Sequence, residues 1–469
     1  MEKGKVMDKN STKSKEFSKE NETSVVGYLP DEKPSFGKLV LFGLQHVLVM
    51  LPATVLVAIL TGFPIITTLF ASGFATLCFL LITKGKIPLY YGSSFAYLAP
   101  IMSITTTGAW VNGIAPAELV SQALFGIMVS GLLSVIAGLV IMKFGKNKMD
   151  KILPPTVTGP VAMIIALSLA VNAINDASGI TSTGSIDSTS WIVAIVTLLA
   201  IVIFTIIFRK GLLSQIPLLL GILLGFVIAS IVGMVDYSTI FDGNVFAWST
   251  LPAGYNVFDY LTPSVNWAAV LAIAPIAIAT IPESTAHLYQ IDLYVNKLAE
   301  TKGVNKKYDI ANRLGENLIG DGVADIASAL VGGPAGTNYG ENISTMVITK
   351  NFSVWVLGAA AILSMIISIF APLTNFFQSI PTAVIGGAEI YLFGVIAAQG
   401  IAIMIDKKVD MFSSKNLAVI AVILIIGIGG SLGLGLGTLP AIATAAIVGI
   451  IMNIGLSLLE NLVDKKTKV

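Results

Sequence analysis

The stretch GGPAGTNYGENISTMVITK, residues 332–350, places glycines, amides and a carboxylate inside an otherwise apolar chain. Ionisable side chains at membrane depth cost about 2.5 kcal/mol or more on insertion scales. Only 36 residues lie between Arg313 and Lys350, too few for two full spans, which need about 40 residues and a turn. The stretch therefore predicts short or broken segments.

The surrounding composition is that of a polytopic membrane protein. Of the 469 residues, 55% are hydrophobic and 12% are charged, whereas a soluble globular protein carries about 25% charged residues. The mean hydropathy is +0.86. Apolar runs such as LVLFGLQHVLVMLPATVLVAIL, residues 39–60, are long enough to span about 30 Å of hydrocarbon as helices. The single cysteine, Cys78, rules out an internal disulfide bond.

Positive charges define the expected topology. Lysine and arginine fall in clusters separated by apolar intervals, and cytoplasmic loops hold the excess of these residues. Pairs of crossings between neighbouring clusters predict about fourteen spans, with both termini in the cytoplasm. The predicted outer loops, 172–190 and 235–265, contain neither lysine nor arginine. Residues 1–36 and 463–469 are polar and predict cytoplasmic tails, the first of them disordered.

A second interrupted stretch, KIPLYYGSSFAYLAPIMSITTTGAW (86–110), has the same character. Its YGSS (91–94) corresponds to YGEN (339–342), and PPTVTGP (154–160) corresponds to IPTAVIGG (380–387) in the same order. These matches fit an inverted repeat, because an odd number of spans per half inverts the second copy; the alternative is that the motifs only cap helices. Glycine-interrupted segments at matching positions are typical of transporter binding sites.

The polar residues within these apolar segments are the candidate site. Glu283 and His287 share one helical face and are suited to proton exchange, although a structural helix–helix contact is the alternative. Glu341 and Asn342 open a predicted half-helix, where free backbone N–H groups bind acceptors; Asn342 is also a candidate helix cap. Together with backbone donors at Phe95, the carboxylates complement a flat, neutral heterocycle such as a nucleobase, and they would repel an inorganic anion.

Four further polar residues remain with open roles. Asp321 and Asp325 share a face and are predicted to brace the protein core or to take part in proton coupling. Glu389 lies within a predicted span, and a hinge, a dimer contact and the substrate path are all open for it. His46 is predicted to be a buried hydrogen-bonding group rather than a proton carrier.

Six motifs in order, among them YGSSFAYLAP, PESTAH, TNYGENISTMVITK and IPTAVIGGAEIYLFG, resemble the nucleobase–ascorbate transporter family, also called the nucleobase:cation symporter-2 family. Within that family the chain looks most like bacterial uracil permeases, over residues 37–460. The resemblance implies an all-α polytopic membrane protein with 14 segments in two inverted seven-segment repeats. Short antiparallel strands near Tyr90–Phe95 and Asn338–Glu341 would precede half-helices in spans 3 and 10. A core domain (37–145, spans 1–4; 264–372, spans 8–11) would face a gate domain (152–235, spans 5–7; 378–462, spans 12–14).

The resemblance also implies roles for individual residues. Glu283 and Glu341 would bind the base, with His287 linked to Glu283 in proton coupling. Phe393 stands where uracil permeases tend to have a gate-domain tyrosine. The remaining implied substrate-binding residues are Ala53, Ser94, Phe95, Tyr339, Gly340 and Asn342.

The chain also departs from the family pattern near the expected pocket. Ser344 replaces a signature glycine, and Glu-Ser-Thr-Ala-His at 283–287 replaces a pattern closer to Glu-His-x-Gly-His. These changes bear on base identity more than on fold. Glu341 favours uracil, because xanthine-type members commonly carry glutamine there.

The sequence therefore predicts a transporter of the bacterial cytoplasmic membrane and not an enzyme, since it holds no metal-ligand cluster, catalytic triad or phosphate loop. We expect proton-coupled import of uracil without a cofactor, with sodium as the alternative coupling ion. The alternatives in function are a xanthine or oxopurine permease of the same family and an anion transporter of the same architecture. The expected partners are the base, membrane lipid and a second copy through the gate domain; nucleic acid is not expected.

Overall fold

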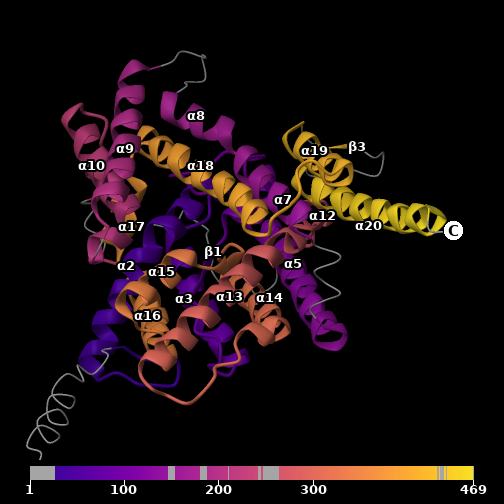
Figure 1. The fold of residues 1–469 in the computed structure, drawn as a ribbon. Helices are drawn as coiled ribbons and strands as arrows, with labels where there is room; N and C mark the ends of the chain where they lie inside the picture. Colours follow the sequence, from indigo (N-terminus) through magenta and orange to yellow (C-terminus); the bar gives the residue numbers. More distant parts are fainter. Residues whose placement is uncertain are drawn as a thin grey trace, which may run out of the picture.

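The computed structural model describes residues 27–145, 154–179, 187–209, 211–240, 245–246, 263–429, 432–433, 438–439 and 441–467. The predicted tail up to residue 26, parts of the predicted outer loops and residues 468–469 lie outside this set. The described chain is almost entirely helical (Figure 1).

Eight described segments are long and apolar enough to cross a membrane. Four shorter apolar helices of 10–17 residues accompany them: Phe95–Thr105, Pro217–Ile231, Val354–Ile367 and Ser414–Gly429. The long segments are Phe36–Thr61, Ile65–Ile82, Ala117–Phe144, Pro155–Ser178, Ser188–Ile207, Trp267–Thr301, Thr382–Asp406 and Ala441–Glu460.

One group of helices packs around α14. Helix α14 contacts α5 and α3, and α16 contacts α3 and α2. Glycines allow the close approach of α5 and α14: a Cβ added to Gly131 would lie 2.5 Å from the carbonyl oxygen of Gly322. Small residues at a crossing point let two helix backbones approach closely within a membrane. The bounds are α2 Phe36–Thr61, α3 Ile65–Ile82, α5 Ala117–Phe144, α14 Leu314–Leu330 and α16 Val354–Ile367.

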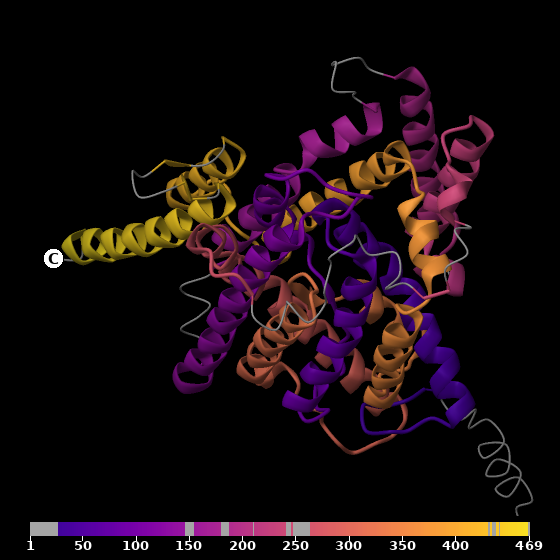
Figure 2. The ribbon, with the colours of Figure 1, turned by 180° about the vertical axis from the view of Figure 1, so that it is seen from behind.

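A second group packs around α18. This helix contacts α7, α8 and α9, while α19 contacts α7 and α20. Both views show α20 extending away from the rest of the molecule (Figures 1 and 2). The bounds are α7 Pro155–Leu167, α8 Ala170–Ser178, α9 Ser188–Ile207, α10 Pro217–Ile231, α18 Thr382–Asp406, α19 Ser414–Gly429 and α20 Ala441–Thr467.

Helix α13 contacts both groups, since it packs against α5 and α14 and also against α7 and α20. The remaining elements are short, and several lie next to the groups described above. They are η1 Phe95–Tyr97, α4 Leu98–Thr105, η2 Leu212–Gln215, α11 Tyr237–Ile240, α12 Trp267–Ile273, α13 Ile276–Thr301, η5 Ala311–Arg313, α15 Gly340–Thr349, α17 Ala371–Gln378, and the strand pair β3 Leu432–Gly433 and β4 Thr438–Leu439.

A two-stranded antiparallel sheet joins the two interrupted stretches. Strand β1 (Tyr91–Ser93) pairs with β2 (Gly336–Asn338) in the register Tyr91 to Asn338 and Ser93 to Gly336. This confirms the pair of strands that the family resemblance implied, although β2 ends at Asn338 because α15 already begins at Gly340. The predicted short segments before Lys350 are also confirmed: α14 has 17 residues and α15 has 10.

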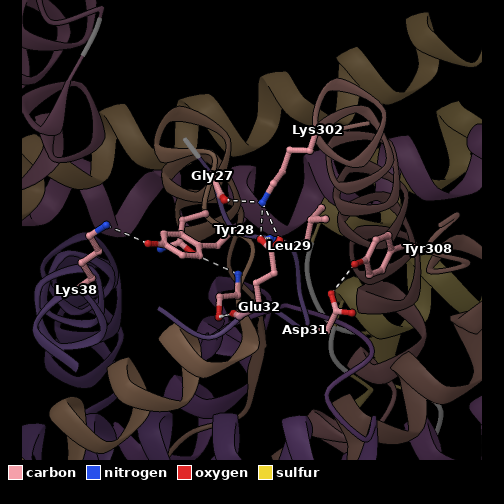
Figure 3. A network of polar contacts seen from close by, with 10 residues as sticks. Gly27, Tyr28, Leu29, Asp31, Glu32, Lys38, Lys302 and Tyr308 are labelled. Atoms are coloured by element: carbon pink, nitrogen blue, oxygen red, sulfur yellow. Dashed lines mark hydrogen bonds and ion pairs between the residues drawn. The ribbon is translucent and has the colours of Figure 1, made fainter. Parts of the chain in front are cut away.

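Residues 27–35, which the composition assigned to a disordered tail, pack against the rest of the chain (Figure 3). Lys302 binds Glu32 at 2.7 Å, and Lys306 binds Asp31 at 2.6 Å. Burial acts to raise the pKa of Asp31, but hydrogen bonds from Lys306 and Tyr308 outweigh it, and the pKa is lowered. The lysine partners that hold this acidic segment lie far away in the sequence, which is why local composition did not reveal the contact.

Candidate functional site

The β1–β2 pair brings the starts of two short helices together. We call the start of η1 after β1 (Ser94 and Phe95) the β1 junction, and the start of α15 after β2 (Tyr339 to Asn342) the β2 junction. After β1 the chain enters η1 and α4, and after β2 it enters α15. Tyr339 locks the two strand ends together, because its hydroxyl donates a hydrogen bond to the Ser93 carbonyl at 2.9 Å. The same hydroxyl lies 2.9 Å from the hydroxyl of Thr54 on α2. Tyr339, expected to contact substrate, is 3% exposed and therefore serves to fix these junctions.

The β1 junction is neutral and capped by its own serine. The Ser94 hydroxyl accepts a hydrogen bond from the Ala96 N–H at 3.3 Å, and the Ser94 N–H donates to the Ala335 carbonyl at 3.0 Å. Ser94 is buried, whereas Phe95 is only partly buried. Of these two residues, Phe95 is therefore the more accessible one.

The β2 junction is acidic, and no side chain caps it. Tyr339 occupies the cap position without a side-chain hydrogen bond, and Glu341 lies exposed in the first turn of α15. Asn342 is fully buried, and its amide nitrogen lies 3.0 Å from the His46 ring nitrogen Nδ1. Asn342 therefore organises the site through α2 and does not cap α15. The same contact, with His46 only 1% exposed, confirms His46 as a buried hydrogen-bonding group.

Helix α13 presents Glu283 and His287 to the start of α15. Glu283 is exposed and lies one helical turn before His287 on α13. A Cβ added to Gly340 would lie 3.2 Å from His287 Nε2, so the glycine allows the imidazole to approach the helix start. The structure thus brings His287 to the start of α15, next to Glu341, with Glu283 one helical turn away on α13.

A buried polar network lies behind this acidic surface. Ser284 donates a hydrogen bond to Asp321, and the Asn338 amide donates to Asp321 at 2.8 Å. The Asn317 amide donates to the Ser284 hydroxyl at 2.6 Å. Asp321 therefore connects α13, α14 and β2, which supports the bracing interpretation of this residue. Sequence reasoning missed Ser284, Asn317 and Asn338, although Asn317 precedes Asp321 by one helical turn and so shares its face.

Asp325 connects the two strands by hydrogen bonds, as Asp321 connects α13, α14 and β2. It accepts hydrogen bonds from the Tyr91 hydroxyl and from the Gly336 N–H, the latter at 2.8 Å. One carboxylate thereby holds both strands, and Asp325 is only 3% exposed. Tyr91 was also missed, because its partner lies 234 positions away in the chain.

Two further residues that were predicted to bind substrate, Ala53 and Phe393, lie outside the two junctions. Ala53 is 2% exposed on α2, next to Thr54, which bonds Tyr339. Phe393 is 4% exposed on α18, in the second group of helices. The structure therefore places Ala53 beside the junctions and Phe393 on a different helix group.

Comparisons with known proteins agree with this architecture. A uracil permease of Bacillus caldolyticus is 36% identical over 433 residues, covering 90% of this chain and 93% of that protein. A putative pyrimidine permease, RutG, of Escherichia coli (strain K12) is 36% identical over 455 residues, covering 95% of each. A uracil permease of Bacillus subtilis (strain 168) is 37% identical over 419 residues, covering 88% of this chain and 91% of that protein.

Solved structures share the fold at low identity. The transmembrane domain of the cyanobacterial bicarbonate transporter BicA aligns with a TM-score of 0.56 and 15% identity, over 91% of this chain and 100% of that one. The murine anion transporter Slc26a9 aligns with a TM-score of 0.64 and 13% identity, over 98% of this chain and 77% of that one. These similarities show the fold alone.

A family model described as "Permease family", Xan_ur_permease, matches residues 37–436. This match and the relatives confirm the resemblance to the nucleobase:cation symporter-2 family. The chain therefore belongs to this permease family, and it is an integral membrane transporter rather than an enzyme.

Proposed function

We propose that the protein imports a nucleobase, specifically uracil, across a bacterial cytoplasmic membrane by proton symport. The observation that carries this proposal is that Glu283 and Glu341 are both exposed, on two helices that meet where His287 approaches Gly340 at the start of α15. The relatives named as uracil permeases support the choice of base.

The chemistry of the junctions suits the edges of uracil. Glu283 and Glu341 accept hydrogen bonds from ring N–H groups, and hydrogen bonds to charged acceptors contribute about 1.5–3 kcal/mol each. Backbone N–H groups at Phe95 and Gly340 donate to the ring carbonyls. Two carboxylates repel an inorganic anion, which argues against the anion transport named for the structural neighbours.

Proton coupling follows from the same pair of acids. Protonation of Glu283 removes one of two neighbouring negative charges and thereby favours binding at Glu341. His287, four residues from Glu283 on α13, relays the proton. Sodium is the alternative ion.

The two helix groups correspond to the core and gate of an alternating-access transporter. We assign fourteen crossings by counting α14 and α15 together with the eight long segments and the four shorter helices. The β1 and β2 junctions occupy matching positions in two inverted repeats. Movement of the α18 group against the α14 group exposes the site to each side in turn, and the α18 group provides the surface for a homodimer.

Uptake into proteoliposomes tests the substrate. Labelled uracil should accumulate when the exterior is more acidic than the interior, without sodium, and unlabelled uracil should compete better than xanthine, uric acid or thymine. Stronger competition by xanthine would favour an oxopurine permease. Base-independent flux of sulfate or bicarbonate would overturn the proposal in favour of an anion transporter.

A matched pair of substitutions tests the coupling. Glu283→Gln should abolish the response of uptake to the pH gradient, whereas Glu118→Gln, which neutralises an exposed acid at the start of α5, should leave it intact. Full gradient-driven uptake by Glu283→Gln would show that Glu283 does not carry proton coupling and that another group does.

A further inference from the structure

A second pair of acids lies in the α18 helix group. Glu389 on α18 is 0% exposed, and neither of its carboxyl oxygens receives a hydrogen bond from the described residues. Asp176 on α8 is partly buried. Buried polar groups almost always have a partner, so an unpartnered carboxylate requires an explanation such as a bound ion or proton.

Close packing of α8 on α18 brings these acids together. A Cβ added to Gly386 would lie 2.1 Å from the Ala177 backbone nitrogen, so the two helices touch at this point. Glu389 follows Gly386 by three residues and so shares its face of α18. The same added Cβ would lie 2.6 Å from the carbonyl carbon of Asp176, so Asp176 and Glu389 flank the same contact between α8 and α18.

Nothing nearby neutralises the pair. Helices α7, α8, α9, α10 and α18 contain no lysine, arginine or histidine. The other acid beside α8 is Asp187, whose carboxylate is occupied in capping α9 through Thr189 and Ser190. Two ionised carboxylates only accept hydrogen bonds and repel each other, whereas one shared proton supplies both a donor and a neutral partner.

A pocket lies beside one member of the pair, Asp176. A pocket of about 350 Å³ is lined by Met102, Ser103 and Thr106, at the end of α4, and by Asn172, Asn175 and Asp176 on α8. Asp176 thus lines the pocket, whereas Glu389 is buried and does not. We infer that Asp176 and Glu389 together bind one proton, which enters from the pocket between α4 and α8.

This proton site is separate from Glu283 and His287 on α13. It is positioned to affect transport, because Glu389 and Phe393 stand four residues apart on the same face of α18. Loss of the proton leaves two neighbouring negative charges between α8 and α18 and pushes the helices apart. The inference depends on the packing of these helices and not on the identity of the transported base.

Infrared spectroscopy of the purified full-length protein tests the inference directly. A carboxylic-acid carbonyl band should persist in the wild-type protein at neutral pH and should lose one group's intensity in Glu389→Gln. This variant should still fold, because the glutamine amide donates a hydrogen bond to Asp176. Asp176→Asn should lose the same band, and Glu118→Gln should retain it. An unchanged band in both Asp176→Asn and Glu389→Gln would overturn the inference.

Thermal unfolding at different pH values provides a second measurement. Carboxyl groups of the unfolded chain lose their protons above about pH 4. A folded state that keeps an extra proton is therefore destabilised as pH rises, by about tenfold in the folding equilibrium per pH unit. Glu389→Gln should show a shallower decline than the wild-type protein. An equal slope, or stabilisation of the wild-type pair by sodium together with loss of the acid band, would contradict proton binding.

Binding of uracil separates this inference from the proposed function. Glu389→Gln should retain a thermal shift with uracil, since α18 packs on α7, α8 and α9, whereas the α15 helix of Glu341 packs on α2 and α13. Absence of that shift in the wild-type protein would count against uracil as substrate and would leave the proton site standing.

Discussion

At the end of β1, Ser94 caps the turn that follows and the junction carries no charge, whereas at the end of β2 no side chain caps α15 and Glu341 lies exposed in its first turn. Both junctions follow three-residue strands that pair with each other. The backbone plan is thus repeated while the side-chain chemistry is not. A ligand with donors on one edge and acceptors on another requires such a difference, because two identical junctions would offer it the same groups twice.

The largest effect is expected from a change that breaks both junctions at once. In Gly336→Ala the new Cβ would lie 2.4 Å from the Gly92 carbonyl oxygen, a backbone atom that cannot move aside. Overpacking of this kind costs about 1–3 kcal/mol, occasionally more. We expect a lower melting temperature and loss of uracil uptake. Gly358→Ala, where nothing lies within 4 Å, is the control and should behave as the wild-type protein. Normal stability of Gly336→Ala would show that the strands are not tightly paired.

The substitution Glu341→Gln tests the acidic junction, because it keeps the shape of the side chain and removes its negative charge. Loss of a charge-assisted hydrogen bond of about 1.5–3 kcal/mol weakens uracil binding by about 10- to 150-fold. Binding can be measured by titration of the purified protein, with Glu118→Gln as the matched control. Unchanged affinity would remove Glu341 from the site and make the two junctions equivalent.

The smallest effect is expected at the neutral junction. Ser94→Ala removes the hydrogen bond to the Ala96 N–H and should lower stability by about 0.5–2 kcal/mol, with uracil affinity unchanged. Ser103→Ala in α4 is the control, because its hydroxyl bonds only the Pro100 carbonyl of its own helix. A large loss of affinity in Ser94→Ala would indicate that the serine itself contacts the base.

The sequence predicted best those features of the fold that depend on neighbouring residues along the chain. Charge spacing and glycine content predicted the short α14 and α15, and the family motifs implied the paired strands. The meeting of α13 with the start of α15 also followed from those motifs. Long-range hydrogen bonds did not follow, because each partner has an ordinary local sequence. The bridge from Tyr339 to Thr54 and the bond from Asn338 to Asp321 depend on how distant helices are oriented.

The segment before α2 shows the same limit. Asp31 and Glu32 belong to a polar stretch whose composition favours disorder, yet Lys302 and Lys306 hold them. Exposed ion pairs are individually weak, typically about 0–1 kcal/mol, so the burial of Leu29 and the backbone bond from Tyr28 to Lys350 contribute to the attachment. Such attachments become visible only in three dimensions.

Helices α7, α8, α9, α10 and α18 contain no basic side chain, which determines how membrane voltage acts on these helices. An electric field exerts a net force only on charged groups. These helices contain no fixed cation on which the field can act. A transmembrane potential of 100 mV does about 2.3 kcal/mol of work on one elementary charge carried across the full membrane. With one shared proton the Asp176–Glu389 pair carries one negative charge, and loss of that proton doubles the charge on which the resting potential, negative inside, exerts an outward force.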